Sequence, residues 1–185
     1  MTEWFTADLH LGHDNIIRYC DRPFKTVTDM NQALIENWNA RVGSDDTAYL
    51  LGDFCMARKR EEVQEYRDQL NGKIILVRGN HDHKITRKVF QPDCFDDLPL
   101  EIGPYKCILA HRPFYPPQIE VPARDQDTNA ARQASYGAFD FVISGHIHEK
   151  RLWTGKSFNV GVDKHDFFPL SFEEVLSHLE NFNKN

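Results

Sequence analysis

The sequence predicts an α/β fold in which several buried strands end at one polar edge. Five short apolar runs have the pattern of buried strands, and segments with helical spacing lie between some of them. Each of the five runs ends on Asp, Asn or His, and three of the five turn through a glycine. Ligands of open α/β sheets bind beyond the carboxyl ends of the strands, so we expect these polar side chains to meet at one place.

The strand ends carry the residues on which the functional interpretation depends. One histidine after an apolar run is usually a satisfied core residue, but five strand ends of the same kind favour a ligand site. The central run, 74–77, continues into a glycine, which permits a sharp turn or a close approach to a ligand. The five runs are 4–7, 48–51, 74–77, 107–110 and 141–144, and the residues that follow them are Asp8, His10, Asp53, Asn80, His81, Asp82, His111, His146 and His148.

Helices are expected between these strands. Residues 15–20 form a short helix, and Thr28 is expected to cap a longer one that runs to about residue 41, with Met30, Leu34 and Trp38 at helical spacing. A charged helix covers 58–70, and a helix beginning after His83 would place Lys84, Arg87 and Lys88 on one face. The later expectations are an irregular or short-stranded segment at 92–103, a helix near 126–134, short strands at 151–154 and 157–160, and a last helix opened by a Ser171–Glu174 capping box.

Composition limits the class of protein. A length of 185 residues, with 41% hydrophobic and 27% charged residues, suits one globular domain over 1–185. The start of the chain has no signal-type stretch and no run suits a membrane span, so we expect a cytoplasmic protein without a membrane partner. The net charge of −6 argues against a surface that coats nucleic acid. The four scattered cysteines fit neither a disulfide framework nor a zinc finger.

The strand-end residues suit a pair of metal ions. Imidazole mixed with oxygen donors, without a thiolate, favours Mn, Fe, Zn or Ni over Ca or Mg. The set is too large for one tetrahedral zinc with an open position, but it fits two metals that share a carboxylate. Such a pair can orient a phosphoryl oxygen, generate hydroxide from water and stabilise the leaving oxygen, which is what phosphate-ester hydrolysis requires. The seven expected ligands are Asp8, His10, Asp53, Asn80, His111, His146 and His148.

The ordered motifs resemble those of the calcineurin-like metallophosphoesterase superfamily. The likeness spans residues 8–148, and the opening strand, Trp-Phe-Thr-Ala-Asp, is similar to that of small stand-alone bacterial or phage phosphoesterases. Each motif is short, but all five occur in order at strand ends. They are Asp8-x-His10, Gly52-Asp53, Gly79-Asn80-His81-Asp82, His111 and Gly145-His146-x-His148.

The resemblance implies a fold and a role for each residue. The fold is a four-layer αββα sandwich of two mixed β-sheets flanked by helices. His81 would be the acid that protonates the leaving group, and Asp82 would orient it. One metal, with Mn expected in vitro, would be held by Asp8, His10, Asp53 and His148, and the other by Asp53, Asn80, His111 and His146, with Asp53 bridging.

The expected function is dimetal hydrolysis of a small phosphodiester or phosphomonoester, with nucleotides among the candidate substrates. A nuclease is the alternative within hydrolases, although the acidic balance does not favour it. A metal-binding scaffold without activity is less favoured, because the ligands and the acid histidine are all present. His13 could touch substrate or cap the next turn, and the latter is slightly favoured. Arg78 and Arg112 could clamp phosphate or pair with carboxylates, and Phe114, Tyr115 and Trp153 could stack on a base or pack their loops.

Overall fold

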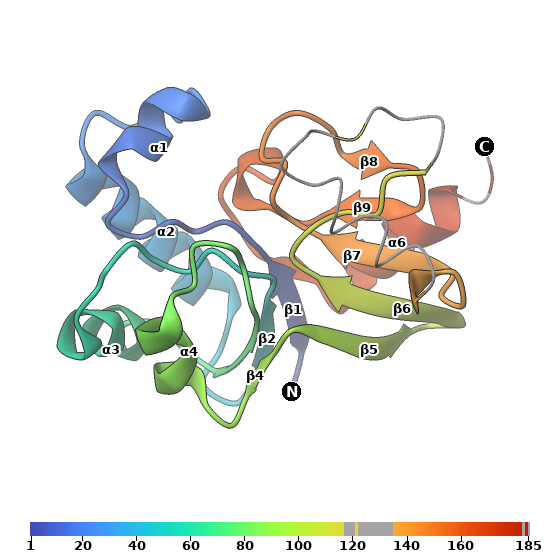
Figure 1. Ribbon diagram of the computed structural model, residues 1–185, viewed down its shortest axis with the longest axis horizontal. Coiled ribbons are helices and arrows are strands. Elements are labelled where there is room, and N and C mark those ends of the chain that lie inside the picture. Colours follow the sequence, from blue (N-terminus) through green and yellow to red (C-terminus); the bar gives the residue numbers. More distant parts are fainter. Residues whose placement is uncertain (117–120, 122–134, 183, 185) are drawn as a thin grey trace.

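Two five-stranded mixed sheets form the centre of the computed structural model, which describes residues 1–116, 121, 135–182 and 184 (Figure 1). The first sheet has the order β10-β1-β2-β3-β4, with all neighbours parallel except β10 and β1. Its strands are β1 (Glu3–Thr6), β2 (Thr47–Leu50), β3 (Lys73–Val77), β4 (Cys94–Phe95) and β10 (Leu170–Ser171).

The second sheet has the order β5-β6-β7-β9-β8, with parallel pairing at β6–β7 and β7–β9 and antiparallel pairing at its two edges. Its strands are β5 (Asp97–Ile102), β6 (Tyr105–Ala110), β7 (Phe141–Ser144), β8 (Trp153–Thr154) and β9 (Ser157–Asn159). Segment 92–103 therefore contains the longer strand β5.

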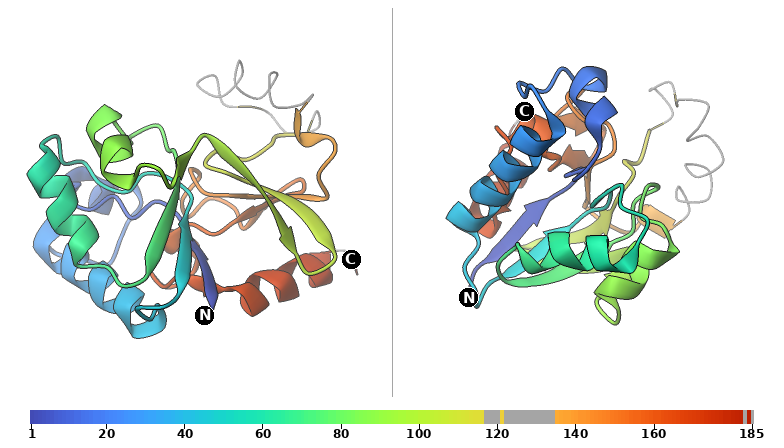
Figure 2. Two further views of the ribbon diagram at one scale, coloured as in Figure 1. Left: turned by 90° about the horizontal axis from the view of Figure 1, so that it is seen from below. Right: turned by 90° about the vertical axis from the view of Figure 1, so that its left-hand side faces the viewer.

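Apolar side chains hold the two sheets face to face. Phe5 and Tyr49 from the first sheet share one buried cluster with Leu109, Ile143 and Phe158 from the second. Helix α6 (Phe172–Phe182) adds to this cluster and contacts β1, β10 and β5 (Figure 2). The expected sandwich of two mixed sheets with flanking helices is confirmed.

A second cluster joins the outer face of the first sheet to its helices. Met30, Leu34 and Trp38 pack there together with Leu50 and Leu76 of the strands, as their helical spacing predicts. None of the helices in the described part of the chain combines the length and the apolar character that a membrane span requires. The helices on this side are α1 (Asp14–Tyr19), α2 (Val27–Arg41), α3 (Arg60–Asp68) and α4 (Lys84–Phe90).

Capping bonds fix two helix starts. Thr26, and not Thr28, caps α2, because its hydroxyl accepts a hydrogen bond from the backbone nitrogen of Asp29 at 3.1 Å. The capping box at α6 is confirmed: Ser171 N donates to Glu174 Oε2 at 2.7 Å, and Glu174 N donates to Ser171 Oγ at 3.2 Å. The helix expected near 126–134 lies outside the described residues, and a single domain over 1–185 stays a prediction.

Register brings the ends of the strands to one edge. In the first sheet Thr6 pairs with Leu50, and Leu50 pairs with Leu76, so three parallel strands end level with one another. The two sheets meet where β1 ends, because Ala7 forms a parallel bridge with Gly161, just beyond β9. The segments that follow β1, β2, β3, β6 and β7 therefore converge.

Truncation of α2 at Leu34 tests this packing. Leu34→Ala leaves a cavity between α2 and the first sheet, and we expect it to lower the free energy of unfolding by about 2–5 kcal/mol. Gln32→Ala, on the exposed face of the same helix, should change it by less than about 0.5 kcal/mol. Urea denaturation measures both, and equal effects of the two substitutions would contradict the packing described.

Candidate metal centre

Five of the seven expected ligands adopt left-handed backbone conformations. The φ angles are 61° at Asp8, 53° at His10, 57° at Asp53, 71° at His146 and 50° at His148. Such angles are uncommon outside glycine and cost on the order of 1 kcal/mol or more each. Strain of this kind persists where the surrounding structure enforces it, and it gathers here at the strand ends.

Glycines let the loops after β2 and β3 touch. A Cβ atom on Gly79 would collide with the backbone nitrogen and Oδ1 of Asp53. Gly52 has a φ of +89°, and a Cβ atom there would lie 2.5 Å from Nδ1 of His111. The glycines therefore allow the carboxylate and imidazole groups to approach one another directly.

Three groups of possible metal-ligating atoms lie in the described part of the chain: one is Cys20, His148 and Asp163, and the other two consist only of expected ligands. Of these two, the first consists of Asp8, His10 and His148, and the second of Asp53, His111 and His146. Within each group the ligand atoms lie within 4.8 Å of one another. These two groups match the two ligand sets that the resemblance implies, except that Asp53 is not in the first group and Asn80 is not in the second.

Asp53 lies between the two groups. Its Oδ2 is 3.4 Å from Nε2 of His10 in the first group and 3.4 Å from Nε2 of His111 in its own. Its Oδ1 accepts a hydrogen bond from the backbone nitrogen of His81 at 2.8 Å, which fixes the carboxylate. Asn80 joins the second group, since its Oδ1 lies 3.0 Å from Nε2 of His111.

Lone pairs converge in the second group. His111 Nδ1 lies 2.8 Å from the carbonyl oxygen of Leu51, so this nitrogen carries the proton and Nε2 presents its lone pair. Burial lowers the pKa of His111 to about 4, so the ring is neutral near pH 7. Around Nε2 stand Asn80 Oδ1, Asp53 Oδ2 and, at 3.2 Å, Nδ1 of His146. A cation among these acceptors would remove their mutual repulsion.

In the first group the carboxyl of Asp8 is buried and incompletely hydrogen-bonded. Burial, together with the charges of Asp53 and Asp163, raises the pKa of Asp8 to about 7, against the lowering effect of His148. Asp8 Oδ2 accepts from the backbone nitrogen of His146 at 2.8 Å, but Asp8 Oδ1 is buried and has no hydrogen-bond partner among the described residues. Buried oxygen and nitrogen donors without partners fit a bound divalent cation.

Asp163 and Arg22 lie beside the first group but are not among the residues predicted from the sequence. Asp163 Oδ2 lies 2.8 Å from Nδ1 of His148, and the Arg22 guanidinium binds both Asp163 oxygens at 2.7 and 2.9 Å. Burial would lower the pKa of His148, but hydrogen bonds to Asp163 and Cys20 and the Asp8 charge raise it to about 11. A signal was present, because Asp163 follows the strand at 157–160 through Gly161, as the expected ligands follow theirs.

His81 faces the site, and the neighbouring Asp82 accepts hydrogen bonds from the backbone of both loops. The His81 ring lies 5.3 Å from that of His10, between centroids. Asp82 Oδ2 accepts hydrogen bonds from the backbone nitrogens of Asp53 at 2.9 Å and Gly79 at 2.7 Å, and Oδ1 accepts from Phe54 at 3.0 Å. Both Asp82 oxygens thus hold the two loops together, and the expectation that this carboxylate orients His81 stays a prediction.

Other neighbouring side chains have simpler roles. His13 occupies the N-cap position of α1 without a side-chain capping bond, and its Nδ1 lies 3.4 Å from Nδ1 of His10. Trp153 stacks on Phe182, with ring centroids 4.3 Å apart, and Tyr115 is buried, so both pack their surroundings. Arg78 pairs with a carboxylate, since its Nε lies 3.1 Å from Asp96 Oδ1.

Comparisons with known proteins show the family to which this chain is related. Residues 1–161 match the family model of the calcineurin-like phosphoesterase superfamily domain. A Methanocaldococcus jannaschii protein described as uncharacterised is 33% identical over 96% of this chain and 90% of its own. The Gene 66 protein of Mycobacterium phage D29 is 36% identical over 96% of each chain. A crystal structure of an Aquifex aeolicus protein of unknown function superimposes with a TM-score of 0.76, at 26% identity, covering 96% of this chain and 98% of that one.

Two mixed sheets flanked by helices and a convergence of candidate metal-ligating side chains are the structural features that accompany the family match. The family match covers most of the sequence, from the first strand to the residues beyond β9. The chain therefore belongs to the calcineurin-like phosphoesterase superfamily.

A methyl group at Gly79 tests the contact between the two loops. We expect Gly79→Ala to lower the free energy of unfolding by about 1–3 kcal/mol, because the added Cβ displaces Asp53. Gly43→Ala is the matched control, since a Cβ there would meet its nearest neighbour, Asp46 Oδ2, at 3.4 Å. Thermal unfolding of the two variants gives the comparison, and a Gly79→Ala protein as stable as Gly43→Ala would refute the close approach.

Proposed function

We propose that this protein hydrolyses phosphate esters with two divalent metal ions. One ion would be held by Asp8, His10, Asp53 and His148, and the other by Asp53, Asn80, His111 and His146. The observation that carries the proposal is the position of Asp53, whose Oδ2 lies 3.4 Å from one ring nitrogen of each group. A single carboxylate oxygen so placed suits a ligand that bridges two ions.

The donors favour borderline metals such as Mn, Fe, Zn or Ni, and we expect Mn to support activity in vitro. When bound, such ions supply Lewis acidity and lower the pKa of water. The chain contributes the fixed orientation of the ligands. Leu51 O orients His111, and Asp163 orients His148 through its Nδ1, so that Nε2 of each ring is directed to the site.

His81 is proposed to protonate the leaving oxygen. Its backbone nitrogen is bonded to Asp53 Oδ1, which fixes the residue relative to the bridging carboxylate. An alkoxide is a poor leaving group, so a positioned acid contributes about 10²–10⁴-fold to its rate of departure. The substrate is proposed to be a small phosphodiester, such as one that contains a nucleotide, and a phosphomonoester is the alternative.

Metal dependence is the first test of this function. Protein stripped on a chelating resin should be inactive, and added Mn should restore hydrolysis of bis-p-nitrophenyl phosphate, with p-nitrophenyl phosphate assayed in parallel. The ratio of the two rates distinguishes diesterase from monoesterase activity. Absence of turnover from protein with bound Mn would favour the non-catalytic scaffold.

Substitution of His81 tests the acid. We expect His81→Ala to lower kcat about 10²-fold or more on a dinucleotide, whose alkoxide leaves poorly, and far less on bis-p-nitrophenyl phosphate. His178→Ala, which removes a half-buried histidine of α6, is the control and should hydrolyse both at the wild-type rate. Equal losses of His81→Ala on the two substrates would exclude the role as an acid.

Substitution of Asp163 tests the orientation of His148. Asp163→Asn removes the charge that holds Nδ1 of His148, and we expect Mn affinity to fall about 10- to 100-fold. Asp68→Asn, on the exposed side of α3, should leave the affinity unchanged. Calorimetric titration with Mn measures both, with circular dichroism to show that each variant is folded. A folded Asp163→Asn protein with wild-type affinity would contradict the role.

A further inference from the structure

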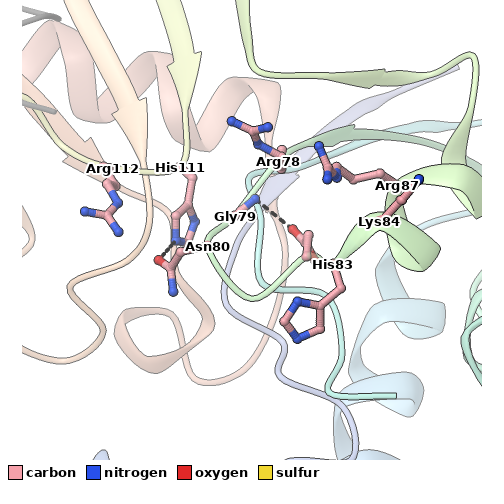
Figure 3. Close-up of a pocket in the computed structure, with 9 residues that line it drawn as sticks. Arg78, Gly79, Asn80, His83, Lys84, Arg87, His111 and Arg112 are labelled. Carbon is pink, nitrogen blue, oxygen red and sulfur yellow. Dashed lines mark hydrogen bonds between the residues drawn. The ribbon is translucent and has the colours of Figure 1, made fainter. Parts of the chain in front are cut away.

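A pocket opens beside the second group of donors. Its volume is about 450 Å³, within the range of small-molecule sites. Asn80 and His111 belong both to the proposed metal site and to the wall of this pocket. Figure 3 shows Lys84 and Arg87 on one side of Gly79, Arg112 with His111 and Asn80 on the other, and Arg78 above Gly79 between them. A substrate bound at the metal-ligating groups would therefore extend into a pocket lined by positively charged side chains.

The charge of the pocket is opposite to that of the chain. The protein carries −6 overall, yet four of the nine residues that line this pocket are Arg or Lys. The one carboxylate among these nine, Asp82, is 4% exposed and accepts three backbone hydrogen bonds. Its charge is directed to the loops, so the cations determine the local potential.

The cations on α4 are available to a ligand. No ion pair within the described ranges involves Lys84 or Arg87. Arg87 Nε is buried without a hydrogen-bond partner in that part of the chain. Arg78 pairs with Asp96, but both side chains are largely exposed, at 42% and 73%, and a pair of this kind is weak enough to exchange.

We propose that this pocket binds a second phosphate group of the substrate, which makes the substrate class small phosphodiesters that carry a neighbouring terminal phosphate. The inference rests on the proposed function, because the scissile phosphate must lie at the donor groups. Guanidinium and ammonium groups together match a doubly charged phosphate in charge and in hydrogen-bond donors. The pocket is local and the rest of the chain is acidic, which favours a compact ligand over a long nucleic acid.

Kinetics on paired substrates test the proposal. Mn-loaded protein is assayed on a dinucleotide with and without a 5′-terminal phosphate, and we expect kcat/KM to be about tenfold or more higher with the phosphate. The Lys84→Gln protein should lose most of this preference for the phosphorylated dinucleotide, and the separate Arg87→Gln protein should lose even more of it. Lys88→Gln, an exposed position on α4 that does not line the pocket, should keep it. A ratio near one in the wild type, or a ratio unchanged by Lys84→Gln, would overturn the proposal.

Binding without turnover separates this inference from the proposed function. Resin-stripped protein is titrated with inorganic pyrophosphate at low salt, and Lys84→Gln should weaken binding about threefold or more, whereas Lys88→Gln should not. Binding that depends on Lys84, without hydrolysis of any phosphoester, would support an anion site in this pocket and contradict the proposed enzymatic function. Hydrolysis at equal rates on both dinucleotides would support the proposed function and exclude a phosphate site in this pocket. Pyrophosphate binding of equal strength in the wild type and in Lys84→Gln would also exclude the phosphate site.

Discussion

Burial of several carboxylates at one point is the constraint on which the rest of the structure depends. Taking an ionised carboxylate out of water is unfavourable unless charges or donors surround it. Asp163 is compensated by Arg22 and His148, and Asp82 by three backbone N–H groups. Asp53 directs Oδ2 at imidazole nitrogens of His10 and His111, whereas Asp8 Oδ1 has no hydrogen-bond partner among the described residues. The pKa of Asp8 is raised to about 7 by its burial and by its acidic neighbours. We propose that two metal ions supply the positive charge that these carboxylates still lack.

The stability that the apolar clusters contribute offsets the unfavourable burial of these carboxylates. Parallel register brings the strand ends level, and glycines let the loops after β2 and β3 meet. Asp82 then fixes those loops through backbone hydrogen bonds, at the same place where several ligands adopt left-handed conformations. Packing between the sheets, with α2 on one face, maintains a geometry that the local backbone disfavours.

Much of the fold and of the candidate site could be predicted because local signals agreed with the global arrangement. The apolar runs, the spacing of Met30, Leu34 and Trp38, and the Ser171–Glu174 capping box all determine structure through near neighbours. Other features depend on contacts between distant segments. Arg22 reaches Asp163 across 141 positions of sequence. The hydrogen bonds of Asp82 to the loop after β2 likewise join segments that are distant in the sequence, so the sequence pattern does not predict them.

Anomalous diffraction from crystals grown with Mn tests the central claim most directly. The account predicts two peaks per chain, about 3.5–4 Å apart, with Asp53 between them. One peak should lie against Asp8, His10 and His148, and the other against Asn80, His111 and His146. A single peak, peaks elsewhere on the molecule, or none at saturating Mn would contradict it, because the buried carboxylates would then be compensated in another way.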